Sequence, residues 1–254
     1  MKTTDVKNGS VIAIIPARFG STRFPGKPLA GKTGKPLIRH VVEAVRHTES
    51  IDDILVATDD RRIFDAVVGF GARAVMTRKD HPNGTSRIAE AIEGLEACDI
   101  IVNVQGDEPE IEPRLIDDLI AVLRTDADAP MATLASPFAE DEDPTDPNIV
   151  KVAVDRRSRA LYFSRSLIPY HRDIPGSRSS TRDYLKHVGL YAYRRDFLLK
   201  YVTLPPTPLE EAEKLEQLRA LEHGHPIAVL QARVLHHGID TPQQYEEFVQ
   251  RYRE

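Results

Sequence analysis

Short aliphatic runs alternate with longer amphipathic stretches over the first 140 residues. The run 11–16 (VIAIIP) is wholly apolar, too short for a helix and ended by proline, so it predicts a buried strand. Residues 36–48 place apolar side chains three and four positions apart, which predicts a helix. The same patterns predict strands at 54–57, 72–76, 100–104 and 131–135 and helices at 60–68, 86–97 and 114–123, with Asp59 and Asp60 as caps of the helix at 60–68. This alternation is typical of an α/β protein with a Rossmann-like, mainly parallel sheet and helices on both faces.

The pattern changes after the acidic, proline-containing segment 141–148 (DEDPTDPN). From there the expected elements are strands at 149–154 and 160–163 around a turn at 155–159, a polar loop at 171–183, a strand at 186–193, one helix at 209–222, a strand at 227–231 and a closing helix at 242–249. We interpret residues 1–254 as a single domain. A smaller α+β subdomain, about 141–230, is inserted into a core formed by about 1–140 and 231–254.

The overall composition limits the class of protein. Lys and Arg number 34 against 39 Asp and Glu, a net charge of −5. A general nucleic-acid surface is not expected, because contacts with phosphate backbones need an excess of basic side chains. The single cysteine, Cys98, excludes an intrachain disulfide, and no apolar run approaches the roughly 18 residues of a membrane span. We therefore expect a soluble, cytoplasmic protein that binds neither nucleic acid nor membranes.

Basic and small residues are concentrated directly after the first predicted strand. Arg18, Arg23 and Lys27 fall within ten residues, and Gly20 and Gly26 lie among them. Glycines let the backbone approach a ligand closely, and ligands of parallel sheets bind beyond the carboxyl ends of the strands. The segment therefore predicts a cradle for a triphosphate, although the GxxxxGK[ST] pattern of a P-loop is absent. A solvated basic turn is the alternative.

Two acidic residues are candidates for a Mg²⁺ site. Asp107 follows the predicted strand 100–104 behind a glycine, and Mg²⁺ prefers one or two carboxylates plus substrate phosphates. Asp240 precedes a Thr-Pro pair at the start of the last predicted helix. Helix capping is the alternative for both, and for Asp240 alone it is the favoured one. The neighbouring His236 and His237 do not indicate zinc, because no further Cys or His lies at ligand spacing.

Eight stretches of the chain carry a resemblance to one known family. They are IPARFGSTRFPGKPL (15–29), HPNGTSRIAEA (81–91), IVNVQGDEP (101–109), NIVKVAVD (148–155), ALYFSRSLIPY (160–170), KHVGLYAYR (186–194), LEQLRALEHG (215–224) and GIDTP (238–242). In these motifs and in their order the chain resembles the 3-deoxy-manno-octulosonate cytidylyltransferases, the CMP-Kdo synthetases of bacterial lipopolysaccharide synthesis. One stretch alone is weakly specific, but together they cover essentially the whole chain.

The resemblance implies transfer of CMP from CTP to the anomeric hydroxyl of 3-deoxy-D-manno-octulosonate (Kdo), with release of pyrophosphate and Mg²⁺ as cofactor. Asp107 and Asp240 would hold the metal, and Lys27 completes the catalytic set. No side chain stands out as a general base, so we expect the metal to activate the attacking hydroxyl. The implied nucleotide-binding residues are Ala17, Arg18, Ser21, Arg23, Lys27, Asn83, Gly84, Thr85 and Arg87.

The resemblance also implies a set of sugar contacts: Gln105, Arg165, His187, Tyr191, Glu216 and Gln217. Arg165 is expected to pair with the carboxylate of the sugar acid. His187 and Tyr191 share one face of a predicted strand, where packing is the alternative role for the tyrosine. Glu216 and Gln217 have a solvated helix face as their alternative. The family is usually dimeric, so a homodimer is expected.

One position departs from the family pattern. Ser86 stands where an acid is usual, and a hydroxyl cannot supply the same charge. Altered recognition of the sugar, for example of an amino-substituted variant, is one hypothesis for this change. Two other functions stay open: a different nucleotidyltransferase, such as a CMP-sialic acid synthetase or a nucleoside-diphosphate-sugar pyrophosphorylase, and a non-enzymatic nucleotide-binding protein. Retention of Lys27, Asp107 and Asp240 argues against the second.

Overall fold

The computed structural model describes residues 9–20, 23–95, 98–172, 184–235 and 238–253. It divides into two compact units, one formed by residues 1–117 and 235–254 and the other by residues 118–234. The expected boundaries were about 140 and 230. The first lies earlier in the structure because the strand at 131–137 pairs with strands of the second unit.

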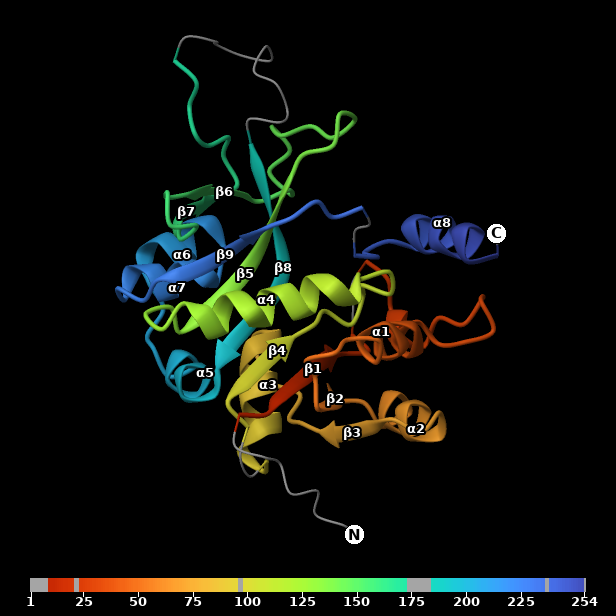
Figure 1. Cartoon of the computed structure of the whole chain (residues 1–254). Coiled ribbons are helices and arrows are strands. Elements are labelled where there is room, and N and C mark those ends of the chain that lie inside the picture. Colours follow the sequence, from red (N-terminus) through yellow and green to blue (C-terminus); the bar gives the residue numbers. More distant parts are fainter. Residues whose placement is uncertain (1–8, 21–22, 96–97, 173–183, 236–237, 254) are drawn as a thin grey trace. The chain divides into compact units, whose positions relative to one another are not determined.

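The first unit is built on four parallel strands. They are β1 (Val11–Ala17), β2 (Asp53–Thr58), β3 (Arg73–Met76) and β4 (Ile100–Asn103). Their order is β3-β2-β1-β4, with β1 pairing in parallel with both β2 and β4 (Figure 1). The strand predicted at 11–16 is the central one here, and its apolar residues are buried. The parallel sheet predicted for this part of the chain is confirmed.

Helices cover both faces of this sheet. The unit contains α1 (Leu37–Val45), α2 (Arg61–Gly69), α3 (Gly84–Glu93), α8 (Pro242–Arg253) and a short 3-10 helix, η1 (Lys27–Leu29), while α4 (Pro113–Thr125) spans the boundary between the units. Pro16 of β1 lies against the backbone of α3 at Gly84. The neighbouring residue Ile15 instead lies with Ile38 of α1 beside Gly106. Because neighbouring strand residues point to opposite faces, α3 and α1 cover opposite faces of β1.

Capping residues set where two of these helices begin. Asp60 accepts the N–H of Arg62 at 2.9 Å and caps α2, as expected, whereas Asp59 pairs with Arg87 instead. The helix predicted to begin at Ser86 begins at Gly84, because the side chain of Asn83 accepts the Ser86 N–H at 2.9 Å. The first turn of α3 therefore lies beside the carboxyl end of β1.

The C-terminal segment returns to the first unit through an apolar cluster. Leu37 of α1 packs with Ile239 and with three residues of α8, namely Tyr245, Phe248 and Val249. Burying these side chains removes apolar surface from water, which is the main stabilising contribution in such a contact. The contact holds the segment around Asp240 against the first unit, far in sequence from the loops that follow β1 and β4.

The second unit has mixed strand directions. It contains β5 (Met131–Pro137), β6 (Lys151–Val154), β7 (Ala160–Ser164), β8 (Leu185–Arg194) and β9 (Ile227–Gln231). β5 pairs antiparallel with β8 and parallel with β9, and β6 and β7 form the predicted antiparallel pair. The helices are α5 (Arg195–Tyr201), which the sequence analysis did not predict, α6 (Pro208–Glu213) and α7 (Gln217–Glu222).

The single helix predicted at 209–222 is wrong, because the segment forms two helices. Lys214 adopts a left-handed conformation with φ of 53° and ends α6. The guanidinium of Arg165 donates to the carbonyl of Glu213 at 2.7 Å and to that of Lys214 at 3.5 Å. The apolar spacing suits a continuous helix, but these tertiary hydrogen bonds stabilise the break.

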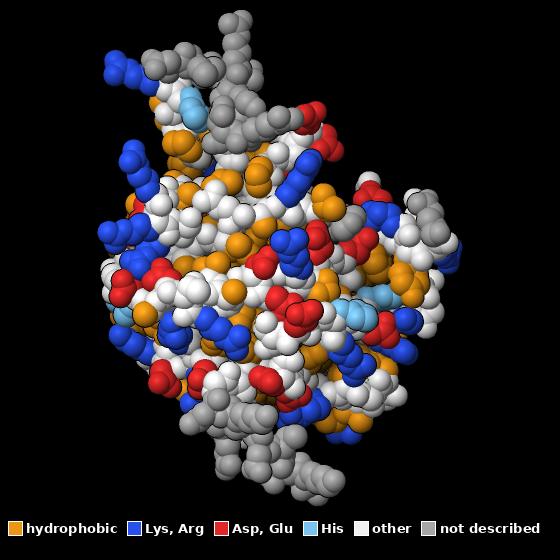
Figure 2. All heavy atoms as spheres, viewed as in Figure 1, with side chains coloured by type: hydrophobic (Ala, Val, Ile, Leu, Met, Phe, Trp, Pro, Cys, Tyr) orange, Lys and Arg blue, Asp and Glu red, His pale blue; other side chains and the backbone are white. Residues whose placement is uncertain are grey.

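The composition predicts neither a general nucleic-acid surface nor a membrane span, and the surface and the helices can be compared with these two expectations. On the face shown in Figure 2, basic and acidic side chains are interspersed among the described residues. None of the helices in the described ranges is both long enough and apolar enough to cross a lipid bilayer.

Candidate nucleotide-binding and active site

A cavity of about 480 Å³ opens at the carboxyl ends of β1 and β4 in the first unit; we call it the nucleotide cavity. Its volume lies in the range of small-molecule sites. The residues that line it are Pro16, Ala17, Arg18, Arg23, Lys27, Pro28, His81, Pro82, Asn83, Gly84, Arg87, Gln105, Gly106, Asp107 and Asp240. They come from the loop after β1, the start of α3, the loop after β4 and the segment before α8, so four separate stretches of sequence form one site.

Glycines allow the two strand-end loops to approach each other. A Cβ atom on Gly106 would lie 2.8 Å from the carbonyl oxygen of Pro16, closer than a side chain permits. Gly26 has a φ of +70°, and its N–H donates to the carbonyl of Phe19 at 3.0 Å. This turn places Lys27 at the first position of η1, with its side chain directed into the cavity.

Lys27 lies between the two predicted metal carboxylates. Its ammonium is 2.6 Å from Oδ2 of Asp107 and 3.5 Å from Oδ1 of Asp240. The two carboxylate oxygens are therefore no farther apart than the sum of these distances. The Lys27 side chain is only 11% exposed, so its position is fixed by its surroundings. The structure thus brings together three predicted residues that lie up to 213 positions apart in the sequence.

Backbone hydrogen bonds connect the segments that carry these side chains. The N–H of Ile239 donates to the carbonyl of Asp107 at 2.8 Å, and the ammonium of Lys27 donates to the carbonyl of Ile239 at 2.6 Å. Arg23 adds an ion pair with Asp240 at 3.0 Å, although its side chain is 66% exposed. Lys27 is accordingly a buried structural cation of the site, and Arg23 is an exposed one that can reorient.

Glu108 adds little charge beside Asp107. Burial, with a contribution from the nearby negative charge of Asp107, raises the pKa of Glu108 to about 8. This carboxyl group is therefore mostly protonated at neutral pH. Asp107 and Asp240 are left as the two carboxylates of this end of the cavity.

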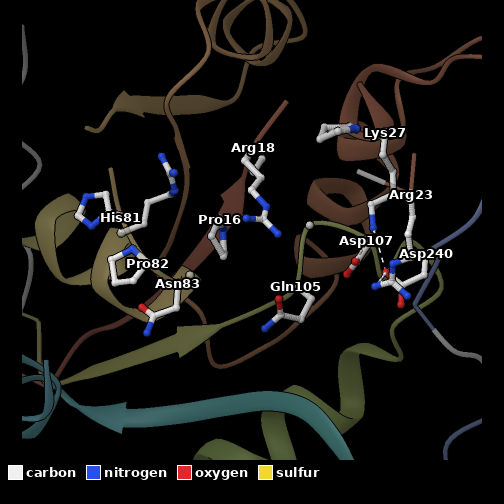
Figure 3. A pocket seen from close by; sticks show the side chains of 15 residues that line it. Pro16, Arg18, Arg23, Lys27, His81, Pro82, Asn83, Gln105, Asp107 and Asp240 are labelled. Carbon is white, nitrogen blue, oxygen red and sulfur yellow. Dashed lines mark hydrogen bonds and ion pairs between the residues drawn. The ribbon is translucent and has the colours of Figure 1, made fainter. Parts of the chain in front are cut away.

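The opposite end of the cavity is formed by the start of α3 and the residues before it. Figure 3 shows His81, Pro82 and Asn83 at this end, away from Lys27 and the two carboxylates. Nδ1 of His81 lies 3.1 Å from Oγ of Ser86, and Nε2 contacts the carboxylate of Glu90. The cavity is therefore polar along its length: Lys27 and the two carboxylates lie at one end, and His81 and the N-terminus of α3 lie at the other.

The side chain of Ser86 makes a hydrogen bond at the start of its own helix, α3. Its hydroxyl donates to the carbonyl of Asn83 at 3.1 Å, while the carboxylate next to His81 comes from Glu90, one turn further along the same helix face. A negative charge is thus present beside His81 even though position 86 has none. The sequence analysis gave His81 no role, although it lies in a stretch that carried the resemblance.

Most of the predicted nucleotide-binding residues line the cavity. Ala17, Arg18, Arg23, Lys27, Asn83, Gly84 and Arg87 do so. The guanidinium of Arg87 is held by Thr77 at 2.5 Å and by Asp59 at 2.8 Å, so it also connects α3 to the end of β2. Thr85 is buried within α3 and is not among the lining residues. Ser21 lies outside the described residues.

Of the predicted sugar contacts, Gln105 lines the cavity and the other five belong to the second unit. There the rings of His187 and Tyr191 lie 5.4 Å apart, and the His187 ring packs edge-on against Phe163 at 5.1 Å. Nε2 of His187 is 3.0 Å from the hydroxyl of Thr133. We call Thr133, Phe163, His187 and Tyr191 the His187 cluster.

Burial sets the protonation states in the His187 cluster. It lowers the pKa of His187 to about 4 and raises the pKa of Tyr191 above its ordinary value, to which the negative charge of Glu216 also contributes. Both side chains are therefore neutral near pH 7. The influence of Glu216 on Tyr191 places a third predicted sugar contact near this cluster.

Gln217 does not lie on a solvated helix face. It is 6% exposed, and among the described residues its buried Nε2 has no hydrogen-bond partner. An unpaired buried amide is costly, so a ligand or a water molecule that accepts its hydrogen would stabilise it.

Arg165 has a structural role at the junction of α6 and α7. Besides the carbonyls of Glu213 and Lys214, its guanidinium donates to the carbonyl of Pro147 at 2.9 Å. The carboxylate of Glu213 in turn accepts the backbone N–H of Arg165 at 2.9 Å. Pairing of Arg165 with a sugar carboxylate stays a prediction.

The donor set of the nucleotide cavity fits Mg²⁺. Two carboxylates converge at the end of the cavity, and among the described residues no group of three or more His, Cys, Asp and Glu is arranged to hold a metal. Mg²⁺ is held in this way by one or two carboxylates, with water and substrate phosphates as its remaining ligands. Asp107 and Asp240 are the residues that would bind it.

The parallel α/β sheet, the basic loop after β1 and the two carboxylates, Asp107 after β4 and Asp240 before α8, define a nucleotidyltransferase. The sequence model described as Cytidylyltransferase matches residues 12–228, and the chain belongs to this family.

Named relatives agree with the family. The 3-deoxy-manno-octulosonate cytidylyltransferase of Syntrophobacter fumaroxidans is 51% identical over 94% of this chain and 95% of its own length. The protein of the same name from Geobacter sulfurreducens is 49% identical over 95% and 99%. A solved structure of a CMP:2-keto-3-deoxy-manno-octonic acid synthetase complexed with CTP has a TM-score of 0.88 at 45% identity and covers 95% of this chain and 98% of that one. The fold class predicted from the sequence is confirmed.

A more distant structure shares the fold alone. The 4-diphosphocytidyl-2C-methyl-D-erythritol synthase from Anaerococcus prevotii has a TM-score of 0.64 at 13% identity, covering 97% of this chain and 99% of that one.

Proposed function

We propose that this protein is a 3-deoxy-manno-octulosonate cytidylyltransferase. It transfers CMP from CTP to the anomeric hydroxyl of Kdo and releases pyrophosphate. The relatives named above carry this activity in their names over nearly the whole length of the chain. The observation that carries the proposal is the placement of the Lys27 ammonium between Asp107 and Asp240 at the basic end of the nucleotide cavity.

In this proposal the two ends of the cavity bind different parts of the nucleotide. Arg18, Arg23 and Lys27 neutralise the triphosphate, because phosphoryl-type transfer depends mainly on positioning and charge stabilisation. The N-terminus of α3 and Asn83 face the cytidine end, where backbone N–H groups and a side-chain amide can read the edge of the base.

Asp107 and Asp240 hold Mg²⁺ in this proposal. When bound, the metal would supply charge stabilisation for phosphoryl transfer and would lower the pKa of the attacking hydroxyl. Lys27 keeps the two carboxylates in place and limits their repulsion of the triphosphate. Its contacts with Asp107 and with the carbonyl of Ile239 restrain the ammonium within reach of both.

Gln105 and five residues of the second unit are the proposed contacts of the sugar acid. His187, Tyr191, Glu216 and Gln217 offer hydrogen-bond donors and acceptors for hydroxyl groups. The unpaired Nε2 of Gln217 supports such a role. Arg165 is proposed as the partner of the sugar carboxylate. We also propose that the protein is a cytoplasmic homodimer.

Pyrophosphate release tests the function directly. Each of CTP, UTP and ATP is combined with Kdo or with N-acetylneuraminate, with and without Mg²⁺. We expect turnover with CTP, Kdo and Mg²⁺ and its loss when EDTA removes the metal. Turnover with N-acetylneuraminate but not with Kdo would instead indicate a CMP-sialic acid synthetase.

Asp107→Asn tests the carboxylate role. It should lower kcat/KM by about 1,000-fold, since a metal-ion contact is worth several kcal/mol in the transition state. Asp65→Asn, a change of the same kind at an exposed residue of α2 outside the cavity, is the matched control and should leave kcat/KM unchanged. Retained activity in Asp107→Asn would contradict the metal assignment.

A further inference from the structure

Thr133 lies at an irregularity in the pairing of β5 with β8. The register passes from Thr133 opposite Tyr191 to Leu134 opposite Val188, so two residues of β8 have no partner on β5. The fully buried Thr133 hydroxyl faces this irregularity. Its Oγ1 lies 2.9 Å from the carbonyl oxygen of Leu190, 3.3 Å from that of Val188 and 3.0 Å from Nε2 of His187, and the Tyr191 hydroxyl is a further hydrogen-bond partner.

The Thr133 hydroxyl has one hydrogen to donate. The carbonyls of Leu190 and Val188 can only accept, and the shorter distance assigns the hydrogen to Leu190. Nε2 of His187 must then carry a proton and donate it to Oγ1. The opposite arrangement would leave two carbonyl oxygens facing lone pairs of Oγ1 in a buried place, at the cost of an unmade hydrogen bond.

This assignment determines what the other nitrogen of His187 can do. In a neutral imidazole with its proton on Nε2, Nδ1 has a lone pair and acts only as an acceptor. Among the described residues, the hydrogen bond of His187 runs from Nε2 to Thr133 and none reaches Nδ1. Contacts with Phe163 and Tyr191 hold the ring in its orientation. The pKa of about 4 supports a neutral ring near pH 7, because burial disfavours the charged form.

We propose that Thr133 is a positioning residue of the sugar site: it commits His187 to the Nε2–H tautomer and so presents Nδ1 as an acceptor for a hydroxyl of the sugar acid. The inference rests on the proposed function for its substrate. It also narrows that function, because a neutral ring with a lone pair at Nδ1 repels a carboxylate. His187 therefore contacts a hydroxyl of the sugar and not its acid group.

The tautomer can be measured on the intact protein without substrate. Long-range ¹H–¹⁵N correlation spectra of ¹⁵N-histidine-labelled protein at pH 7 distinguish the two neutral forms, and His187→Asn identifies the signal. We expect His187 to be neutral with its proton on Nε2. A proton on Nδ1, or a doubly protonated ring, would overturn the inference whatever the enzyme transfers.

Two substitutions of Thr133 test the consequence for the sugar. Thr133→Val removes the hydroxyl at nearly the same volume, and Thr133→Ser keeps it. In Thr133→Val we expect a mixture of tautomers and a rise of about tenfold in KM for Kdo, with KM for CTP unchanged. Thr133→Ser should restore the Nε2–H form and a KM within about twofold of the unmodified protein.

A control on the same strand separates this role from loss of a buried hydroxyl. Ser136 is fully buried in β5, donates to the carbonyl of Pro137 at 3.1 Å and accepts the N–H of Val234 at 3.1 Å. Ser136→Ala should lower stability while leaving the His187 tautomer and KM for Kdo unchanged. An unchanged KM for Kdo in folded Thr133→Val, or an equal rise in Thr133→Ser, would contradict the positioning role.

The tautomer measured in the unmodified protein decides the inference even where Thr133→Val does not fold. Absence of pyrophosphate release from CTP and Kdo in every variant, with the Nε2–H tautomer present, would refute the proposed function and not the tautomer.

Discussion

The nucleotide cavity of the first unit and the His187 cluster of the second hold their polar groups in opposite ways. The cavity places charged side chains on loops, where Lys27 is paired with two carboxylates and Arg23 is largely exposed. The His187 cluster has neutral groups on strands, enclosed by aromatic rings and a buried hydroxyl. Coulomb attraction acts over several ångströms and tolerates some mobility, whereas a hydrogen bond to a neutral hydroxyl needs a fixed direction. We therefore expect phosphate binding at the proposed nucleotide site to depend on charge, and sugar binding at the proposed sugar site to depend on orientation.

Of the substitutions that follow, the one at Lys27 is expected to have the largest effect. Lys27→Met should lower kcat/KM by about 100-fold, because it removes a preorganised cation next to the triphosphate and leaves Asp107 and Asp240 to repel each other. Steady-state pyrophosphate release measures the loss. Lys32→Met, at an exposed lysine paired with Glu246 outside the cavity, is the matched control and should keep full activity. Equal activity of the two variants would show that the positive charge of Lys27 in the cavity is not needed for turnover.

Arg165 is the cationic side chain among the predicted sugar contacts, and its removal tests whether it serves structure or substrate. Arg165→Ala should lower the free energy of unfolding by about 2 kcal/mol, because three backbone carbonyls lose a charged donor. Urea unfolding measures the change, with exposed Arg157→Ala as control. Unchanged stability together with a large rise in KM for Kdo would assign Arg165 to the sugar carboxylate alone.

His187 should make the stability of the second unit depend on pH. Its pKa is about 4 in the folded protein and 6.5 in the unfolded chain, so between these values the unfolded chain binds more protons. Stability is therefore lost as pH falls from about 6.5 to 4, by about 3 kcal/mol from this group. In His187→Asn this part of the pH dependence should disappear from unfolding curves measured at pH 7, 5.5 and 4.5. An unaltered dependence would mean that His187 is not held neutral by burial.

The smallest effect is expected at Ser86. Ser86→Ala removes a hydroxyl that donates to the carbonyl of Asn83 in the first turn of α3. KM for CTP should change by less than about threefold, because the charges of the cavity stay in place. Thr133→Val, in contrast, is expected to raise KM for Kdo about tenfold. The two variants therefore compare the loss of one hydroxyl in each region. A larger effect at Ser86 on CTP than at Thr133 on Kdo would reverse the comparison.

The parallel sheet and the loops that line the nucleotide cavity were predictable because their signals are local. An unbroken apolar strand followed by glycines and basic residues, as after β1, has a meaning that depends little on the rest of the chain. Asp107 and Asp240 were each ambiguous with helix capping when judged from neighbouring residues, and it was the resemblance that paired them. His81 shows the limit: its position in the cavity depends on where α3 begins, which Asn83 determines.

Other features depended on contacts between distant residues. Apolar spacing alone favours one helix at 209–222, whereas hydrogen bonds from the distant Arg165 stabilise the break at Lys214. The tautomer of His187 likewise depends on a hydroxyl 54 positions earlier and on an irregularity between two strands. The periodicity and loop composition of the sequence therefore determined the type of sheet and the location of the charged loops. The tertiary structure decided which carboxylates meet, where the helices break and which histidine nitrogen carries the proton, because each of these depends on the distance and direction between atoms far apart in the chain.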